Sequence, residues 1–347
     1  MFGNIIGNDR VKDVLRRHLA ASRVPNAMLF AGTDGVGKKL FALELARAFV
    51  CRSPNGVEAC GECSACGRVD TFVIPEPTDK NKDEFKKVFF GQHSDVGKVV
   101  AYKRFILVEA IRELEREAYF RPYEANARFF LIDDADKMND AAANALLKTL
   151  EEPASTSHII LITSRPDSLL PTIRSRCQTL RFAPVETKKI EEFLIGERKL
   201  PAADAKLSAR LAFGSVGRAL SIELEKLREQ RETMLHVLRD AIENNDRVSL
   251  LHAAEKLNDA KNKDNFEENL EILLTLIRDV WTLALSGQDE KIINIDLTPR
   301  LKHLAENADT RRLAGWIDEI ELLRESFAVN VNRKVATDAL FMKMASA

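Results

Sequence analysis

The sequence predicts an α/β domain with a parallel sheet and a phosphate loop, followed by helices, and three observations lead to this fold class. An apolar run at 27–31, a glycine-rich turn and a helical pattern reaching residue 49 follow one another as strand, loop and helix. Two further apolar runs, at 128–134 and 158–163, flank a helical pattern at 141–150. Strands that alternate with helices favour a three-layer parallel sheet, and strands that are apolar throughout fit a sheet covered on both faces.

The remaining elements follow in chain order. Residues 8–20 place four apolar residues on one face of a helix that precedes the first strand. Residues 67–92 hold two prolines before a lysine-rich run, which predicts a loop or a short exposed helix. After about residue 183 apolar residues recur at helical spacing and strand patterns disappear. We therefore divide the chain into a nucleotide-binding domain at 1–182, a small helical domain at 183–224 and an all-helical domain at 225–347.

Composition and charge narrow the classes of function. The 347 residues are 45% hydrophobic and 30% charged, as in ordinary soluble globular proteins. A formal net charge of −1 excludes a chain that binds nucleic acid by its overall charge, so any DNA contact would come from a local basic face or from a partner. We find no secretory signal pattern at the N-terminus and no apolar run long enough to span a bilayer, and we expect a cytoplasmic protein.

The glycine-rich turn, Gly32 to Lys39, matches the phosphate-loop pattern G-x-x-x-x-G-K and departs from it at the next position. Gly32, Gly35 and Gly37 would let backbone N–H groups converge on phosphate oxygens, and Lys38 would reach the β- and γ-phosphates of ATP or ADP. The next residue is normally Ser or Thr, whose hydroxyl ligates Mg²⁺. Lys39 offers no oxygen, which argues against magnesium binding. The alternative is a glycine-rich turn without chemical consequence.

Two acids follow the apolar run at 128–132. Asp133 stands where a Walker-B acid holds magnesium, and Asp134 stands where an active ATPase usually has a Glu that orients the attacking water. The Asp134 side chain is one methylene shorter than Glu. Alternatively, Asp134 and the nearby Asp136 cap the next helix. Together with Lys39, Asp134 argues against efficient hydrolysis, whereas nucleotide binding stays compatible with the loop.

Four of the five cysteines fall within sixteen residues. Their spacing is C-x8-C-x2-C-x2-C, which allows four thiolates to close a tetrahedral Cys₄ zinc site; an iron–sulfur cluster is the main rival. In a reducing compartment, clustered cysteines bind metal more readily than they form disulfides. A closed Cys₄ site leaves no position for a substrate, so we interpret the metal as structural. The ligands would be Cys51, Cys60, Cys63 and Cys66, and the distant Cys177 would be a packed thiol.

The combined motifs of residues 1–220 resemble the AAA+ subunits of the bacterial replicative clamp loader. They are the phosphate loop, the Cys₄ insert, the run from Asn144 to Pro153 and the tripeptide Ser175–Cys177. The total length, the start at Phe2–Asn8 and the segments at His93–Val96 and Val108–Arg112 favour a non-motor member over the motor (gamma/tau) subunit. The resemblance implies that the helical segment at 183–224 is a lid. It also implies that the C-terminal helices form an oligomerisation collar, although these match only by size and class.

The resemblance also implies roles for single residues. Arg176 of Ser-Arg-Cys would be an arginine finger that reaches into the nucleotide site of a neighbouring subunit and stabilises charge on the γ-phosphate. On sequence alone an ordinary surface arginine would be the simpler interpretation. Arg174 and Arg181 are close enough to leave the choice of arginine to the resemblance.

Two further positions are assigned in the same way. Ser164, or its neighbour Thr163, falls at the sensor-1 position after the strand at 158–163. Arg218 falls at the sensor-2 position in the lid, and its alternative is an arginine at the start of a helix.

The leading hypothesis is therefore a stator of the clamp loader, a subunit at one end of a pentameric ring that completes a partner's ATP site. Its implied partners are the motor and delta subunits, and through the complex the sliding clamp and primed DNA. One rival is an active AAA+ motor ATPase. The rival from another class is a P-loop kinase for a small molecule, against which the Ser-Arg-Cys element and the long helical tail both argue.

Overall fold

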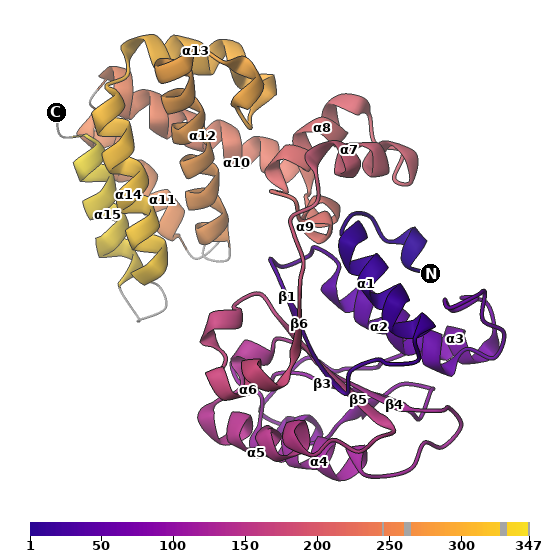
Figure 1. Cartoon of the computed structure of the whole chain (residues 1–347). Coiled ribbons are helices and arrows are strands. Elements are labelled where there is room, and N and C mark those ends of the chain that lie inside the picture. Colours follow the sequence, from indigo (N-terminus) through magenta and orange to yellow (C-terminus); the bar gives the residue numbers. More distant parts are fainter. Residues whose placement is uncertain (245, 260–264, 327–331, 346–347) are drawn as a thin grey trace. The chain divides into compact units, whose positions relative to one another are not determined.

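The computed structural model describes residues 1–244, 246–259, 265–326 and 332–345 and groups them into two compact units (Figure 1). The first unit consists of Met1–Phe193 with Ala212–Leu220, and the second of Leu194–Leu211 with Ser221–Ala347. Residues from the segment 183–224 thus contribute to both units. The division into three domains stays a prediction.

A six-stranded sheet forms the centre of the first unit, with the strand order β2-β3-β4-β5-β1-β6. Five strands run parallel, as predicted, and only the edge strand β2 is antiparallel to its neighbour β3. A strand of two residues is too short to leave an alternation pattern in the sequence, which is why β2 was not expected. The strands are β1 (Ala27–Ala31), β2 (Phe89–Phe90), β3 (Val96–Val99), β4 (Arg128–Ile132), β5 (Ser157–Thr163) and β6 (Gln178–Arg181).

Helices cover both faces of this sheet, with α1, α2 and α3 on one face and α4, α5 and α6 on the other (Figure 1). This is the predicted three-layer arrangement. The helices and helical turns that begin in the first unit are η1 (Phe2–Asn4), α1 (Asp9–Ala20), α2 (Lys38–Val50), α3 (Ser64–Arg68), η2 (Lys82–Lys86), α4 (Val108–Ala118), η3 (Ala135–Lys137), α5 (Asp140–Glu151), η4 (Pro166–Ser168), α6 (Pro171–Arg176), α7 (Thr187–Gly196) and α9 (Val216–Ser221).

Successive residues of each central strand enter two separate cores, because side chains alternate across a sheet. Met28 and Phe30 of β1 pack with the buried face of α1 and α2, whereas Leu29 packs with α4 and α5. Every residue of β1 and β4 is buried, and all of them are apolar except Arg128 at the start of β4. This is the physical reason why these strands read as continuous apolar runs.

The parallel register brings the carboxyl ends of three strands to one edge of the sheet. Ala31 of β1 pairs with Thr163 of β5, and Ile132 of β4 pairs with Leu161 of β5. The residues that follow β1 and β4 are Gly32 and Asp133. Ligands of open α/β sheets bind at this edge. The predicted phosphate loop and the predicted acids therefore meet in space.

The second unit is helical throughout its described residues, as predicted for the C-terminal part. Helix α12 packs against α10, α13 and α14 and contributes most of its apolar residues to their shared core. Among the residues that the structure describes, no helix is long and apolar enough to cross a membrane. The elements are α8 (Ala202–Leu211), α10 (Leu224–Arg239), η5 (Asp240–Asn244), α11 (Arg247–Asn258), α12 (Phe266–Ser286), η7 (Asp289–Lys291), η8 (Ile295–Leu297), α13 (Thr298–Asn307), α14 (Thr310–Ser326) and α15 (Arg333–Met344).

Candidate functional site

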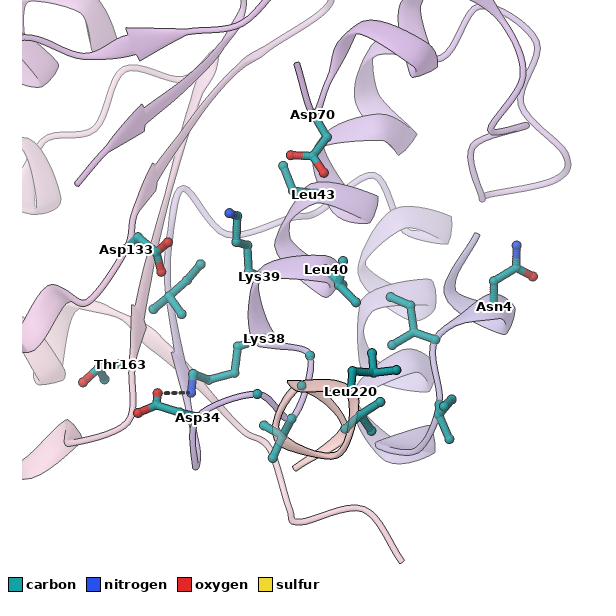
Figure 2. A pocket seen from close by; sticks show the side chains of 18 of the residues that line it. Asn4, Asp34, Lys38, Lys39, Leu40, Leu43, Asp70, Asp133, Thr163 and Leu220 are labelled. Carbon is teal, nitrogen blue, oxygen red and sulfur yellow. Dashed lines mark hydrogen bonds and ion pairs between the residues drawn. The ribbon is translucent and has the colours of Figure 1, made fainter. Parts of the chain in front are cut away.

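A pocket of about 420 Å³ lies over the phosphate loop of the first unit (Figure 2). Its walls come from the N-terminal segment 4–6, the loop and first turns of α2, the ends of β4 and β5, and the start of α9. The pocket brings together six of the predicted site residues, namely Gly35, Gly37, Lys38, Lys39, Asp133 and Asp134. Gly32, Ser164, Arg176 and Arg218 do not line it.

Two loop glycines are required by the backbone and by close packing. Gly37 has a φ of 100°, in the left-handed region that favours glycine, and it lies at the N-cap of α2 in the pocket lining. Gly35 has a φ of 73°, and a Cβ built on it would lie 2.2 Å from Ser215 Oγ. Its carbonyl also accepts a hydrogen bond from the Gly217 N–H at 2.9 Å. The loop and the segment before α9 thus lie in direct contact.

The ammonium group of Lys38 is turned onto the loop itself. It donates to the carbonyls of Gly32 at 2.5 Å and Thr33 at 2.8 Å, and it pairs with Asp34 at 3.5 Å (Figure 2). The side chain is buried, and burial lowers the pKa of Lys38 although Asp34 opposes the shift. The phosphate oxygens of a nucleotide would have to compete with these three oxygens for the ammonium group.

A lysine forms an ion pair with the carboxylate that was predicted to hold magnesium. Lys98, from the buried strand β3, forms an ion pair with Asp133, its Nζ lying 2.7 Å from Oδ2, and the Lys98 side chain is only 4% exposed. Lys39 extends into the same region, toward Asp133 and Asp70 (Figure 2). Desolvation by the surrounding atoms, followed by the neighbouring Lys98 ammonium, lowers the pKa of Lys39.

Asp134 and Asp136 are both engaged by cations. Asp134 adopts a φ of 50° directly before η3, where its side chain makes no capping hydrogen bond and instead accepts from Lys137 at 2.7 Å. Asp136 is nearly buried and accepts from Arg165 Nε at 3.0 Å and Nη2 at 2.8 Å. The sequence offered helix capping as an alternative for these acids, and for the Asp134 side chain the structure has an ion pair instead.

The two candidates for sensor 1 lie in different surroundings. Thr163, at the end of β5, lines the pocket, and its hydroxyl donates to Asp136 Oδ1 at 2.7 Å. The same hydroxyl oxygen accepts the backbone N–H of Arg165 at 2.9 Å. Ser164 is not among the lining residues. Of the two residues, Thr163 is the one that a ligand in the pocket could contact.

The four predicted cysteine ligands form a compact cluster. Their Sγ atoms all lie within 4.8 Å of one another, and the sulfurs of Cys51 and Cys60 are 3.5 Å apart. Four thiolates bound at a Zn–S distance near 2.3 Å are separated by roughly 3.8 Å, so the spacing fits a single tetrahedral ion. An iron–sulfur cluster would place several atoms between the thiolates and would hold them further apart.

Local hydrogen bonds prepare part of this cluster for a cation. The backbone N–H of Cys60 donates to the Cys51 sulfur at 3.3 Å, and that of Cys63 to the Cys60 sulfur at 3.3 Å. Backbone N–H groups of Arg52 and Cys66 lower the pKa of Cys63 to about 6, and burial raises the pKa of Cys66. Thiolates bind metal, so the backbone of the loop favours the ligand form.

Comparison with known proteins adds the family. A model of the family described as DNA polymerase III, delta subunit, matches residues 7–186, and a model described as DNA polymerase III, delta subunit, C terminal, matches residues 225–341. The chain belongs to the DNA polymerase III delta subunit family. It is similar to the delta′ subunit of Bacillus subtilis (strain 168), with 29% identity over 93% of this chain and 92% of the relative. The delta′ subunit of Escherichia coli (strain K12) is 28% identical over 93% and 90%.

The tau subunit resembles only part of this chain. The tau subunit of Escherichia coli (strain K12) is 30% identical over 227 residues, which cover 64% of this chain and 32% of tau. The matches to the delta′ relatives cover 93% of this chain and so extend into its C-terminal helices. The match to tau covers 64% of this chain and leaves the rest unmatched. The predicted resemblance to the delta′ subunit of the clamp loader is thereby confirmed.

Two arginines with predicted roles lie outside the pocket lining of this delta-family chain. Arg176 is the last residue of α6; its Nη1 donates to the Thr172 carbonyl at 2.9 Å, and its Nη2 lies 2.5 Å from Glu151 Oε1. Arg218 lies in α9, with its guanidinium 5.3 Å from the centre of the Phe213 ring. Their assignments as arginine finger and sensor 2 stay predictions.

Sequence reasoning missed Lys98, Asp70 and the Asp136–Arg165 pair. A signal for Lys98 was present, because a single lysine interrupts the apolar run 96–100 and the run has strand length. Register then places β3 beside β4, with Lys98 opposite Leu131, two residues before Asp133. Asp70 follows α3 in the segment 67–92, and nothing in its sequence context indicates that it faces the phosphate loop.

Proposed function

We propose that this chain is a delta′-like stator of the bacterial DNA polymerase III clamp loader, which helps to load the sliding clamp onto primed DNA. The observation that carries the proposal is the match to delta′ subunits over more than nine-tenths of the chain, through both the α/β unit and the C-terminal helices. The alternative of a P-loop kinase explains neither the family match over residues 225–341 nor the Ser-Arg-Cys element.

The proposed chemical contribution of the stator is Arg176. The residue ends a short helix away from the lining of its own nucleotide pocket, and 34% of its side chain is exposed. An arginine placed in this way is accessible to a neighbouring subunit, where it would stabilise charge that develops on a γ-phosphate. The ion pair with Glu151 gives the guanidinium a fixed direction before the neighbour binds.

The chain's own site is proposed to bind nucleotide without supporting efficient hydrolysis. Three features support this division: Lys39 in place of a hydroxyl, Asp133 paired with Lys98, and Thr163 donating to Asp136. Asp134, the acid at the position that would orient an attacking water, is ion-paired with Lys137. ATP or ADP is the proposed ligand of the phosphate loop, and Arg218 of the lid is proposed as its sensor-2 residue.

The Cys₄ cluster is proposed to hold one structural Zn²⁺. Zinc favours four thiolates in a tetrahedron, and a closed set of four leaves no open position for chemistry. Three of the cysteines lie in the loop between α2 and α3, a stretch with few apolar residues of its own, and Cys66 lies in α3. Cross-linking by a metal ion would fix this loop beside the pocket wall that contains Asp70.

Reconstitution tests the proposal directly. The purified chain is mixed with motor and delta subunits from a delta′-containing clamp loader of the same organism, and complex formation is followed by gel filtration. We expect a complex that loads the clamp onto primed DNA only when this chain is present, while the chain alone hydrolyses no ATP above background. Magnesium-dependent turnover by the isolated chain, abolished in Lys38→Ala, would support the motor ATPase instead.

A further inference from the structure

The position where a P-loop protein holds magnesium is filled by charges of the protein itself. Mg²⁺ demands octahedral oxygen ligands at 2.0–2.1 Å and is usually bound by one or two carboxylates, phosphate oxygens and water. Here the carboxylate of Asp133 accepts the Lys98 ammonium at 2.7 Å. The residue that would add a hydroxyl ligand is Lys39. The residues present therefore do not fit the metal.

Removing Lys98 from Asp133 would be costly. The lysine arises from the buried strand β3 and is 4% exposed, so its ammonium has little access to water. A buried ammonium that loses its partner is strongly destabilising, because desolvation is no longer offset by the ion pair. A cation entering from solvent would have to displace this ammonium in addition to shedding its own water shell.

The other acids of the pocket do not supply an alternative metal site. Asp134 pairs with Lys137, and Asp34 faces solvent beside the Lys38 ammonium. Asp70 faces Lys39 from the segment after α3. Positive charge is instead contributed by three lysines around the loop, on α2 and β3, where phosphate oxygens would lie.

We propose that the pocket binds the phosphates of ATP or ADP as a metal-free anion, with Lys98 holding Asp133 in the place of Mg²⁺ and Lys39 adding charge to the phosphate side. This inference rests on the proposed nucleotide binding and specifies its form. Nucleotide at this site is then retained without any need for magnesium. A nucleotide bound in this way also lacks the ion that neutralises charge during phosphoryl transfer.

The test compares ATP binding by the purified full chain in excess Mg²⁺ and in excess EDTA, measured by isothermal titration calorimetry. We expect ATP to bind at least as tightly in EDTA as in Mg²⁺, because the pocket takes the uncomplexed nucleotide whereas excess Mg²⁺ holds ATP as its magnesium complex. Lys38→Ala should weaken binding in both buffers alike. Binding that falls about tenfold or more in EDTA would overturn the proposal.

Two variants separate the lysines from the general fold. In Lys98→Met the Asp133 carboxylate becomes free, so binding in EDTA should weaken about tenfold while Mg²⁺ restores it. Lys39→Thr supplies the missing hydroxyl on the exposed start of α2, so it keeps the test open if Lys98→Met does not fold. Its matched control is Lys188→Thr, an exposed lysine that is also the second residue of a helix, α7.

The outcomes distinguish this inference from the proposed function. If Lys98→Met and Lys39→Thr both keep the wild-type ratio of ATP affinities in Mg²⁺ and in EDTA, the lysines do not replace the metal and the inference fails. If the wild-type chain binds no ATP in either buffer, the inference also fails. The stator role would then still stand or fall by the reconstituted complex, which needs no nucleotide in this pocket.

Discussion

Arg176 and Glu151 form an ion pair at 2.5 Å that joins the end of α6 to the end of α5. Both side chains are partly exposed, so the pair itself contributes little to stability. Its consequence is geometric, because the carboxylate holds one side of the guanidinium and the Thr172 carbonyl holds another. The arginine side chain is 34% exposed and does not line the chain's own pocket.

The first prediction concerns this arginine. Arg176→Ala should leave the chain folded and able to enter the complex, since an exposed ion pair is removed, but should lower the ATPase rate of the reconstituted ring. Loss of an arginine finger reduces turnover about 10³-fold or more at the site concerned. The ring as a whole keeps the ATPase rate that its other, intact sites contribute. Steady-state ATPase with clamp and primed DNA measures the effect.

Arg174→Ala is the matched control for this experiment. Arg174 lies two residues earlier on the same helix and is likewise ion-paired, to Asp167 at 2.7 Å. Its replacement should leave ring ATPase close to wild type. Equal rates for wild type and Arg176→Ala, or equal losses in both variants, would remove the trans role from Arg176.

The second prediction concerns the contact between the phosphate loop and the segment before α9. Gly35→Ala places a Cβ 2.2 Å from Ser215 Oγ and 3.2 Å from Gly217 Cα, at a φ of 73°. The left-handed backbone alone costs about 1–2 kcal/mol for a residue with a side chain. The steric clash should in addition push residues 215–217 away from the loop and weaken ATP binding, as measured by calorimetry.

Gly56→Ala isolates the backbone contribution of this substitution. Gly56 belongs to the same unit and has a similar φ of 65°, but a Cβ added there would meet nothing within 4 Å. The variant should lose stability to a similar backbone strain and keep wild-type ATP binding. If Gly35→Ala binds ATP as tightly as Gly56→Ala does, the close contact has no bearing on the pocket.

The third prediction is the metal content of the Cys₄ cluster. Elemental analysis of the purified chain should find one zinc per chain, and Cys60→Ser should lose most of it, because an alcohol replaces one of four thiolates. Cys177→Ser is the control, since Cys177 is a buried thiol whose pKa burial raises to about 12 and which lies outside the cluster. Iron in the wild-type chain, or no metal at all, would refute the zinc assignment.

Some parts of this molecule are readable from sequence because a local pattern carries them. The phosphate loop needs glycine at Gly35 and Gly37 for backbone reasons, and the cysteine spacing itself limits the geometry of the cluster. Strands β1, β4 and β5 are buried on both faces and read as apolar runs.

Other parts depend on register and could not be read in the same way. Lys98 meets Asp133 only because β3 pairs with β4, although the whole of α4 and its flanking loops separate the two strands in the chain. Thr163 and Asp136 meet for the same reason, across the edge of the sheet. A sequence pattern shows that a residue lies at a strand end, but the strand order decides which residue lies opposite.

The last prediction concerns stability against pH. His158 in β5 is buried, its Nδ1–H donates to the Pro25 carbonyl at 3.0 Å, and its ring stacks on Phe129. Burial lowers the pKa of His158 below its ordinary 6.5, and burial also lowers that of His93. Below pH 6.5 the unfolded chain therefore binds protons that the folded chain does not, and stability falls as the pH decreases, by up to about 1.4 kcal/mol per pH unit for each histidine.

His158→Phe tests the assignment because it keeps the stack on Phe129 and removes the titrating group. The variant should lose about 1 kcal/mol at pH 7 with the hydrogen bond to Pro25, but its stability should fall less steeply between pH 6.5 and 5. Both tryptophans, Trp281 and Trp316, lie in the second unit, so their fluorescence does not report on this sheet. The stability of this sheet is therefore measured by hydrogen exchange of β4 and β5 peptides in urea. A slope unchanged from wild type would show that His158 takes up its proton equally in the folded and unfolded chain.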